Sequence, residues 1–268
     1  MAEEDIKDSN VKSTIEAVTG LVKAVPVYED AVQPAAKQIG KSLETITKAV
    51  NIALVPLRGL VWGYERIEEW LKMRVAQKLE NIPQENVITP PLQIAGPTIE
   101  ALRYTGEDSE IRELYANLIA TSMNSELVHK AHPGYVDIIR NMTSDEAILL
   151  KCFVSSDIYP FIDVKKKLDD GYIICYSTFT IFHRPYNISR IDLIPLYIDN
   201  LIRLGLLERT DTLLLTQPNT YEPLVEDEYL SDLKCQITLS EREIGYNKGI
   251  IRLNSFGKEF VNHIVNSL

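Results

Sequence analysis

The chain has 268 residues, 45% hydrophobic and 25% charged, with a formal net charge of -10 at pH 7. This balance argues against a disordered chain and fits one large globular domain or two smaller ones. The acidic excess is spread over both halves, which argues against non-specific DNA binding, because that depends on neutralising phosphates. The three cysteines form no CxxC pair and are odd in number, so we expect no disulfide framework.

The N-terminal segment MAEEDIKDSN is acidic and lacks the basic and apolar regions of a signal peptide. No window of the sequence reaches the roughly 18 uncharged apolar residues that a membrane-spanning helix needs. We therefore expect a cytoplasmic protein that is not integral to the membrane.

Apolar residues recur at alternating steps of three and four through the first quarter of the chain. This is the period of amphipathic helices that pack along a seam. Pro26 and Pro34 suit the first turn of a helix, where a proline gives up no intrahelical hydrogen bond. The sequence predicts a helix over about residues 9–25 and a longer one from residue 27 or 33 to residue 80.

Within the longer helix, residues 52–62 are apolar on both faces. Eleven helical residues rise about 16 Å, roughly half of a hydrocarbon core, so they cannot span a bilayer. A proline predicts a kink here, and two glycines have the GxxxG spacing that lets another backbone approach. The segment is either a buried central helix or a surface that docks on a membrane or on another copy of the chain. In the second case the contacting residues are Pro56, Arg58, Gly59, Trp62 and Gly63.

Four prolines and a glycine predict a loop over residues 81–97. Asp108 or Ser109 is placed to cap a following helix, and Thr143 and Glu146 have the spacing of a capping box. The helices predicted after the loop cover residues 98–105, 108–124, 132–142 and 143–153.

After about residue 155, β-branched and aromatic residues become frequent. We expect a strand over residues 171–182, paired in a hairpin with either residues 162–168 or residues 183–188. The elements predicted after it are a helix over 189–209, strands over 211–217 and 248–255, and a closing helix over 255–265.

These elements predict a mainly α fold with some β structure, in two parts. Residues 1–142 form a multi-helix region with a long kinked helix. Residues 143–268 form a winged-helix-like part with a small antiparallel sheet, since helix, helix, strand, strand, helix is the order of that module. Residues 218–247 are a long acidic insertion between its two strands.

The sequence has no Gly-rich phosphate loop, no HExxH, no GxSxG and no cysteine near a histidine, so it contains none of these catalytic motifs. We therefore predict no catalytic residue, no cofactor and no metal. Glu126, His129 and His132 are spaced by three, but on a helix the third side chain rotates off the face of the first. We favour a structural cap or surface histidines there over a metal site.

The lysine run Lys165–Lys167 and the winged-helix order raise the question of DNA binding. A recognition helix normally presents Arg, Lys, Asn or Gln to the DNA. The helix predicted here presents Asp192, Asp199, Asn200 and Arg203, which is the wrong balance for a duplex. A protein-contact or structural module is the better interpretation.

Three segments resemble the abortive-infection alpha family of bacterial proteins: residues 27–71, residues 88–124 and residues 131–147. The closing segments LIRLGLLE and SFGKEFVNHIV are similar in a looser way. The resemblance implies an anti-phage role, in which an infected cell stops growing or dies before the virus matures, and it transfers no catalytic motif. The residues that match the family most closely are Pro34, Gly40, Pro56, Leu57, Arg58, Gly59, Trp62, Gly63, Pro90, Pro91, Gly96, Pro97, Arg103, Tyr104, Glu113, Leu114, Asn117, His132 and Pro133.

Most of these matching residues are prolines, glycines and packing residues that would fix the fold. The polar exceptions are Arg58, Arg103 and Glu113, either as buried partners of one another or as a binding site. We name Arg103, Tyr104, Glu113 and His132 as a candidate polar cluster.

We thus expect a non-enzymatic component of bacterial phage defence. In the first hypothesis, a phage or host protein releases the helix around Trp62, whose apolar segment then engages the inner membrane surface or assembles with other copies. In the alternative, the winged-helix-like part and its acidic insertion sense a phage or host protein, with nucleic acid a less favoured ligand.

Overall fold

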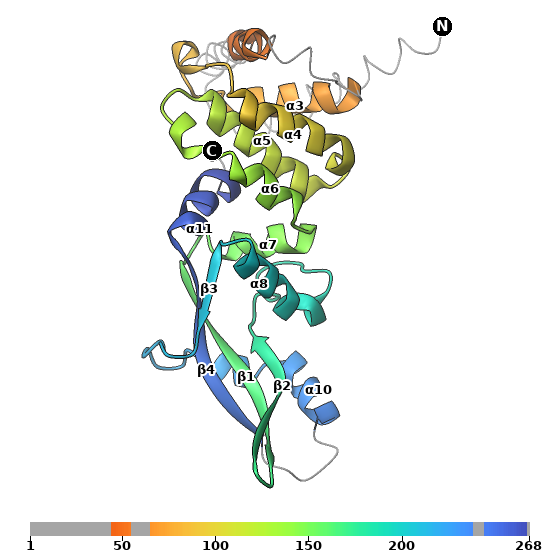
Figure 1. The fold of residues 1–268 in the computed structure, drawn as a ribbon, viewed down its shortest axis with the longest axis vertical. Helices are drawn as coiled ribbons and strands as arrows, with labels where there is room; N and C mark the ends of the chain where they lie inside the picture. Colours follow the sequence, from red (N-terminus) through yellow and green to blue (C-terminus); the bar gives the residue numbers. More distant parts are fainter. Residues whose placement is uncertain (1–43, 55–64, 238–243, 267–268) are drawn as a thin grey trace, which may run out of the picture. The chain divides into compact units, whose positions relative to one another are not determined.

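The computed structural model describes residues 44–54, 65–237 and 244–266 (Figure 1). These residues, apart from Glu44, belong to one compact unit, Thr45–Leu268. The helix predicted over residues 9–25 and the predicted kink at Pro56 lie outside the described residues. On either side of the gap, residues 44–53 are helical and α3 covers Glu65–Lys78, close to the end predicted at residue 80.

The helix at the centre of the first part is α5, Ser109–Met123, which contacts α3, α4, α6 and α7. Eleven of its fifteen residues are buried, so it is covered on nearly all sides. The elements around it are α4 (Leu92–Thr105), α6 (Gly134–Arg140), α7 (Ser144–Cys152) and the short 3-10 turns η2 (Gln84–Asn86) and η3 (Val128–Lys130).

Local hydrogen bonds set where two of these helices begin, as the sequence predicted. The Asp108 side chain accepts hydrogen bonds from the backbone N–H groups of Glu110 and Ile111, both at 3.0 Å. Thr143 and Glu146 form a full capping box at the start of α7. These contacts satisfy backbone donors that have no partner within the helix.

The loop predicted over residues 81–97 is too long at its C-terminal end. Helix α4 already begins at Leu92, with Pro97 inside it. A proline there removes one backbone hydrogen bond. That loss is outweighed because residues on one face of the helix, including Ile94, Thr98 and Leu102, are buried.

The sheet has four antiparallel strands in the order β2-β1-β4-β3 (Figure 1). Strand β2, Gly171–Phe179, pairs in a hairpin with the strand before it, which is the first of the two partners predicted. The other strands are β1 (Ile158–Leu168), β3 (Leu207–Thr210) and β4 (Ile244–Leu253).

Three predicted boundaries in this part are wrong. The helix α8 covers Ile194–Arg203 and ends before Gly205, whose φ of +75° suits glycine and turns the chain into β3. The strand predicted over residues 211–217 is therefore displaced to Leu207–Thr210, and β4 takes in residues 244–247 of the predicted insertion.

The remaining elements are η4 (Ile191–Leu193), α9 (Glu222–Val225), α10 (Glu228–Ile237), α11 (Ser255–Phe260) and the π-helical turn η5 (Val261–Val265). The order α7, α8, β3, β4, α11 follows the predicted order of helices and strands. The β1–β2 hairpin is inserted between the two helices, and α9 and α10 lie in the predicted insertion. The winged-helix designation itself stays a prediction.

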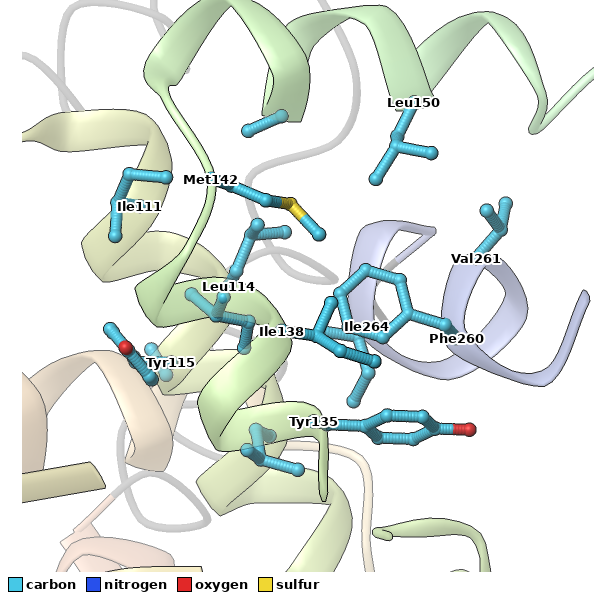
Figure 2. Close-up of a cluster of buried hydrophobic side chains, with 14 of the residues drawn as sticks. Ile111, Leu114, Tyr115, Tyr135, Ile138, Met142, Leu150, Phe260, Val261 and Ile264 are labelled. Atoms are coloured by element: carbon cyan, nitrogen blue, oxygen red, sulfur yellow. The ribbon is translucent and has the colours of Figure 1, made fainter. Parts of the chain in front are cut away.

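The closing helix packs on α5, far away in the sequence (Figure 2). The ring of Phe260 meets that of Tyr135 edge to face, with 5.0 Å between centroids. Asn117 donates a 2.6 Å hydrogen bond to the carbonyl of Ile264, and Thr121 donates one to the carbonyl of His263. Residues on both sides of the predicted division at residue 142 thus share one hydrophobic core.

Candidate functional site

Glu113, a member of the predicted polar cluster, links α5 to α3. Arg74 donates two hydrogen bonds to its Oε1, from Nε at 3.0 Å and from a terminal nitrogen at 2.7 Å, and the Lys78 Nζ lies 2.6 Å from the same oxygen. Burial by itself would raise the pKa of Glu113, but the hydrogen bonds from Arg74 and Lys78 outweigh it and hold the pKa below its ordinary value. The carboxylate therefore joins two helices.

The other members of that cluster lie elsewhere. Arg103 and Tyr104 are on the exposed last turn of α4, where the tyrosine is 81% exposed. His132 accepts a 3.0 Å hydrogen bond from the backbone N–H of Gly134, and its ring packs on Phe256. All four residues are described, and no hydrogen bond, ion pair or ring contact joins any two of them.

The three residues weighed as metal ligands also have separate roles. Glu126 accepts a hydrogen bond from Asn86 at 3.1 Å, His129 is exposed, and His132 caps the start of α6. In the described part of the chain, no group of three or more His, Cys, Asp or Glu side chains is placed to hold a metal ion.

Pro56, Arg58, Gly59, Trp62 and Gly63, and all of the apolar segment after residue 54, lie outside the described residues. Ile52, the first residue of the segment, is 69% exposed. In the described residues, no helix has both the length and the apolar character needed to cross a membrane.

A concentrated patch of exposed apolar side chains lies instead on the β1–β2 hairpin. Leu168 on β1 is 39% exposed, and Tyr172, Ile173 and Ile174 on β2 are 57%, 51% and 51% exposed. We call these four residues the hairpin patch. Successive side chains of a strand point to opposite faces, so half-exposure of three in a row means that neither face of the ribbon is covered.

The backbone geometry explains why the side chains of the hairpin patch are exposed. Asp169 and Asp170 form the turn, and Gly171 follows with φ +147°, a conformation that favours glycine. Among the described residues, the pairing of β1 with β4 extends as far as Lys166 and Ile244. Between Lys166 and the turn, the strand partner of β1 is β2. Strand β2 is the outermost strand of the described sheet, and one side of its backbone has no strand beside it there.

The lysine run considered for DNA binding belongs to the same hairpin. Lys165, Lys166 and Lys167 lie opposite Ile174, Ile173 and Tyr172 in the β1–β2 register. Lys165 donates to the Asn247 side chain at 2.8 Å and lies 4.8 Å from the centre of the Tyr172 ring. Sequence reasoning found the strand and the lysines but missed the patch, although GYIICYSTF, an uncharged run in a charged chain, is a signal for it.

At its inner end the hairpin is held by a buried carboxylate. Asp163, 2% exposed, accepts a 2.8 Å hydrogen bond from the backbone N–H of Thr178 and two from Arg209, at 2.8 and 2.7 Å. The strand register shifts on both sides of Val164. Thr178 has φ +57°, which is rare for a β-branched residue. These contacts fix the direction in which the ribbon leaves the sheet.

The family model described as "Abortive infection alpha" matches residues 63–264, which is most of the chain. The chain belongs to the abortive infection alpha family. This confirms the resemblance found in the sequence. Comparison with the curated proteins gives no match.

Among solved structures, this abortive infection alpha protein is similar to an uncharacterized protein from the hydrocarbon-degrading marine bacterium Alcanivorax borkumensis SK2. The two chains are 20% identical with a TM-score of 0.33, and the similarity covers 47% of this chain and 88% of the other.

The family match begins at residue 63, so it includes Gly63, the predicted polar cluster and the hairpin patch. The predicted interaction residues that precede it are Pro56, Arg58, Gly59 and Trp62.

Proposed function

We propose that this abortive infection alpha protein acts in phage defence as a binding component without catalytic activity. Its contact is the outer edge of β2, which takes up an extended segment of a phage or host protein as a further strand. The observation that carries the proposal is the hairpin patch on an outermost strand, and the family supplies the defence role.

The edge of β2 lacks the devices that usually protect such a strand. Proteins blunt exposed edges with charges, prolines or bulges, because the free N–H and C=O groups pair readily with another chain. Over Gly171–Phe179 the strand carries no charge and no proline, and its register shifts near Val164 lie away from the tip. An unprotected edge of this kind is suited to strand addition by a partner.

The side chains of the patch add apolar contact to the backbone pairing. Tyr172 and Ile174 lie on one face of the ribbon and Ile173 on the other, so an added strand would meet apolar groups on both faces. The partner we infer is thus an extended, largely apolar segment of protein.

Membrane contact through residues 52–62 is the second candidate. It is supported by the exposure of Ile52 at the start of that segment. In this version the protein docks peripherally on the inner membrane surface or assembles with other copies.

The test of the first candidate places a charge on the strand edge. Ile174→Lys changes a half-exposed side chain, so the fold should persist while strand addition is opposed. We expect plaque formation on cells that express this variant to rise at least about tenfold over cells that express the wild type, because strand addition is opposed. The matched control is Leu196→Lys on α8, where the leucine is 60% exposed.

Unchanged protection by the Ile174→Lys variant would refute the strand-addition proposal. Flotation with vesicles of phosphatidylglycerol and phosphatidylcholine distinguishes the second candidate. If the wild-type protein floats and the Ile174→Lys variant both floats and protects, membrane contact outside the hairpin is the better explanation.

A further inference from the structure

A cavity of about 270 Å³ lies where β1 begins and β2 ends. Its inner residues are almost fully buried: Cys152, Thr180, Phe182 and Leu224 are between 1% and 3% exposed. Ser155 and Arg184 at its rim are exposed. The cavity is therefore a pocket with a buried floor and an open mouth, separate from the hairpin patch.

Aromatic rings form one wall of this pocket. The rings of Tyr159 and Phe182 meet edge to face with 5.0 Å between centroids, and Phe153 supports both from behind at 5.2 and 5.6 Å. The Tyr159 hydroxyl donates a 2.6 Å hydrogen bond to the Cys152 carbonyl, so it is already paired. The wall thus presents ring surface, which suits a flat apolar ligand.

The pocket offers no unpaired charge. Arg184 at the rim donates to Asp227 at 2.9 Å, and the two form an ion pair with a closest approach of 2.8 Å. Burial raises the pKa of the Cys152 thiol to about 12, so the thiol is neutral. A charged ligand would lose its hydration here without gaining a free counter-charge, so the lining selects an uncharged one.

One polar group of the lining is left without a partner. Thr180 is 2% exposed, and its Oγ1 makes no hydrogen bond in the described part of the chain. A buried hydroxyl with no partner is costly. The chain reaches this position two residues after Thr178, whose left-handed backbone is held by Asp163. Such strain persists where surrounding contacts enforce it, often beside a ligand site.

We propose that this pocket binds a small, uncharged compound of one or two aromatic rings, with one polar group that hydrogen-bonds to the Thr180 hydroxyl. The Thr180 Oγ1 is itself buried, so its side chain rotates toward the pocket when the ligand binds. The size fits, since an engineered apolar cavity of about 150 Å³ holds benzene and ordinary ligand pockets begin at roughly 300 Å³. The ligand stacks on the Tyr159 and Phe182 wall and enters past Ser155 and Arg184.

Indole and indene are the probes, because they have the same shape and differ in one N–H group. Titration of the full-length protein, followed by ligand-observed NMR, should show saturable binding of both, with indole the tighter. Thr180→Val keeps the side-chain shape and removes the hydroxyl. We expect it to weaken indole binding about five- to tenfold and to change indene binding by less than about twofold.

A second variant tests the site from its rim. Ser155→Trp places a large ring at the exposed rim and should abolish binding of both probes. Leu214→Trp, at a residue that is 53% exposed and outside the pocket, should leave both unchanged. Absence of saturable indole binding to the wild-type protein, or binding that survives Ser155→Trp, would overturn the site. Equal loss of indole and indene with Thr180→Val would overturn the role of the hydroxyl.

Discussion

Asp163 shows how one buried charge decides the geometry of the sheet. Its carboxylate holds the Thr178 backbone and the Arg209 guanidinium together, and Arg209 also stacks on the Phe161 ring at 4.2 Å. No sequence pattern predicts this ion pair, because Asp163 and Arg209 are far apart in the chain. Asp163 does lie within a short run of consecutive buried residues of β1, between Phe161 and Ile162 on one side and Val164 on the other.

Asp163→Ala should be strongly destabilising. It leaves Arg209, whose side chain is 28% exposed, without its partner, and it frees the strained Thr178. We expect a loss of about 3 kcal/mol in the free energy of unfolding, measured by urea denaturation. Asp137→Ala is the control: that aspartate is 75% exposed and 3.5 Å from Arg140, so its loss should cost no more than about 0.5 kcal/mol. Equal costs would show that the Asp163 pair is not a stabilising centre.

Glu113 gives the protein a pH dependence with a defined sign. Its pKa is lower in the folded protein than in the unfolded chain, so the folded state binds fewer protons there. The stability from Glu113 is fully present above the ordinary carboxyl pKa, near 4.5, and is lost as pH falls through the lower folded value. Unfolding free energies measured by urea at pH 7 and at successive acidic pH values should therefore fall less steeply for Glu113→Gln than for the wild type. Glu107→Gln, at an exposed residue, should follow the wild type.

At the scale of elements, the caps of α5 and α7 are connected. Asp108 caps α5 and also accepts a hydrogen bond from the Ser144 hydroxyl at the first turn of α7. Both helix starts were predictable because capping uses side chains within three residues of the backbone that they bind. The contact between the two caps was not predictable, since it depends on how the helices pack.

The two caps should therefore not contribute independently. Asp108→Ala should cost about 1–2 kcal/mol, whereas Asp108→Asn keeps an acceptor and should cost less. In a double-mutant cycle, Asp108→Ala and Ser144→Ala should show a coupling of at least about 0.5 kcal/mol. Strict additivity would mean that the contact between the helices contributes nothing measurable.

The boundaries that sequence reasoning misplaced have one cause. Helix α4 takes in Pro97, and the last three residues of the predicted helix, Leu207, Glu208 and Arg209, pair with β4 instead. In both cases a local signal was overruled by burial or by pairing with a distant strand. Gly205 follows the end of α8, but the strand after it could not be placed without its partner.

For the whole molecule, the decisive contact is between the closing helix and α5. Phe260, Val261 and Ile264 are buried against helices that lie before residue 142 (Figure 2). Phe260→Ala removes a fully buried ring and should cost about 3–5 kcal/mol. Because the core is shared, the whole described unit should unfold in one transition at a lower temperature.

This expectation can be checked with two probes. The tryptophans, Trp62 and Trp70, both precede residue 142, whereas far-UV circular dichroism reports on the whole chain. The two signals should shift together with Phe260→Ala. A tryptophan transition that stays at the wild-type temperature would show that the N-terminal helices unfold independently.

The sequence by itself determined the family, the mainly helical class, the helix caps and the presence of strand β2, because these depend on order, periodicity and neighbouring residues. The tertiary structure alone separated Arg103, Tyr104, Glu113 and His132, exposed the hairpin patch and formed the pocket at Thr180. Each of these depends on which side chains are covered by elements distant in the sequence, and tertiary packing decides which ones are.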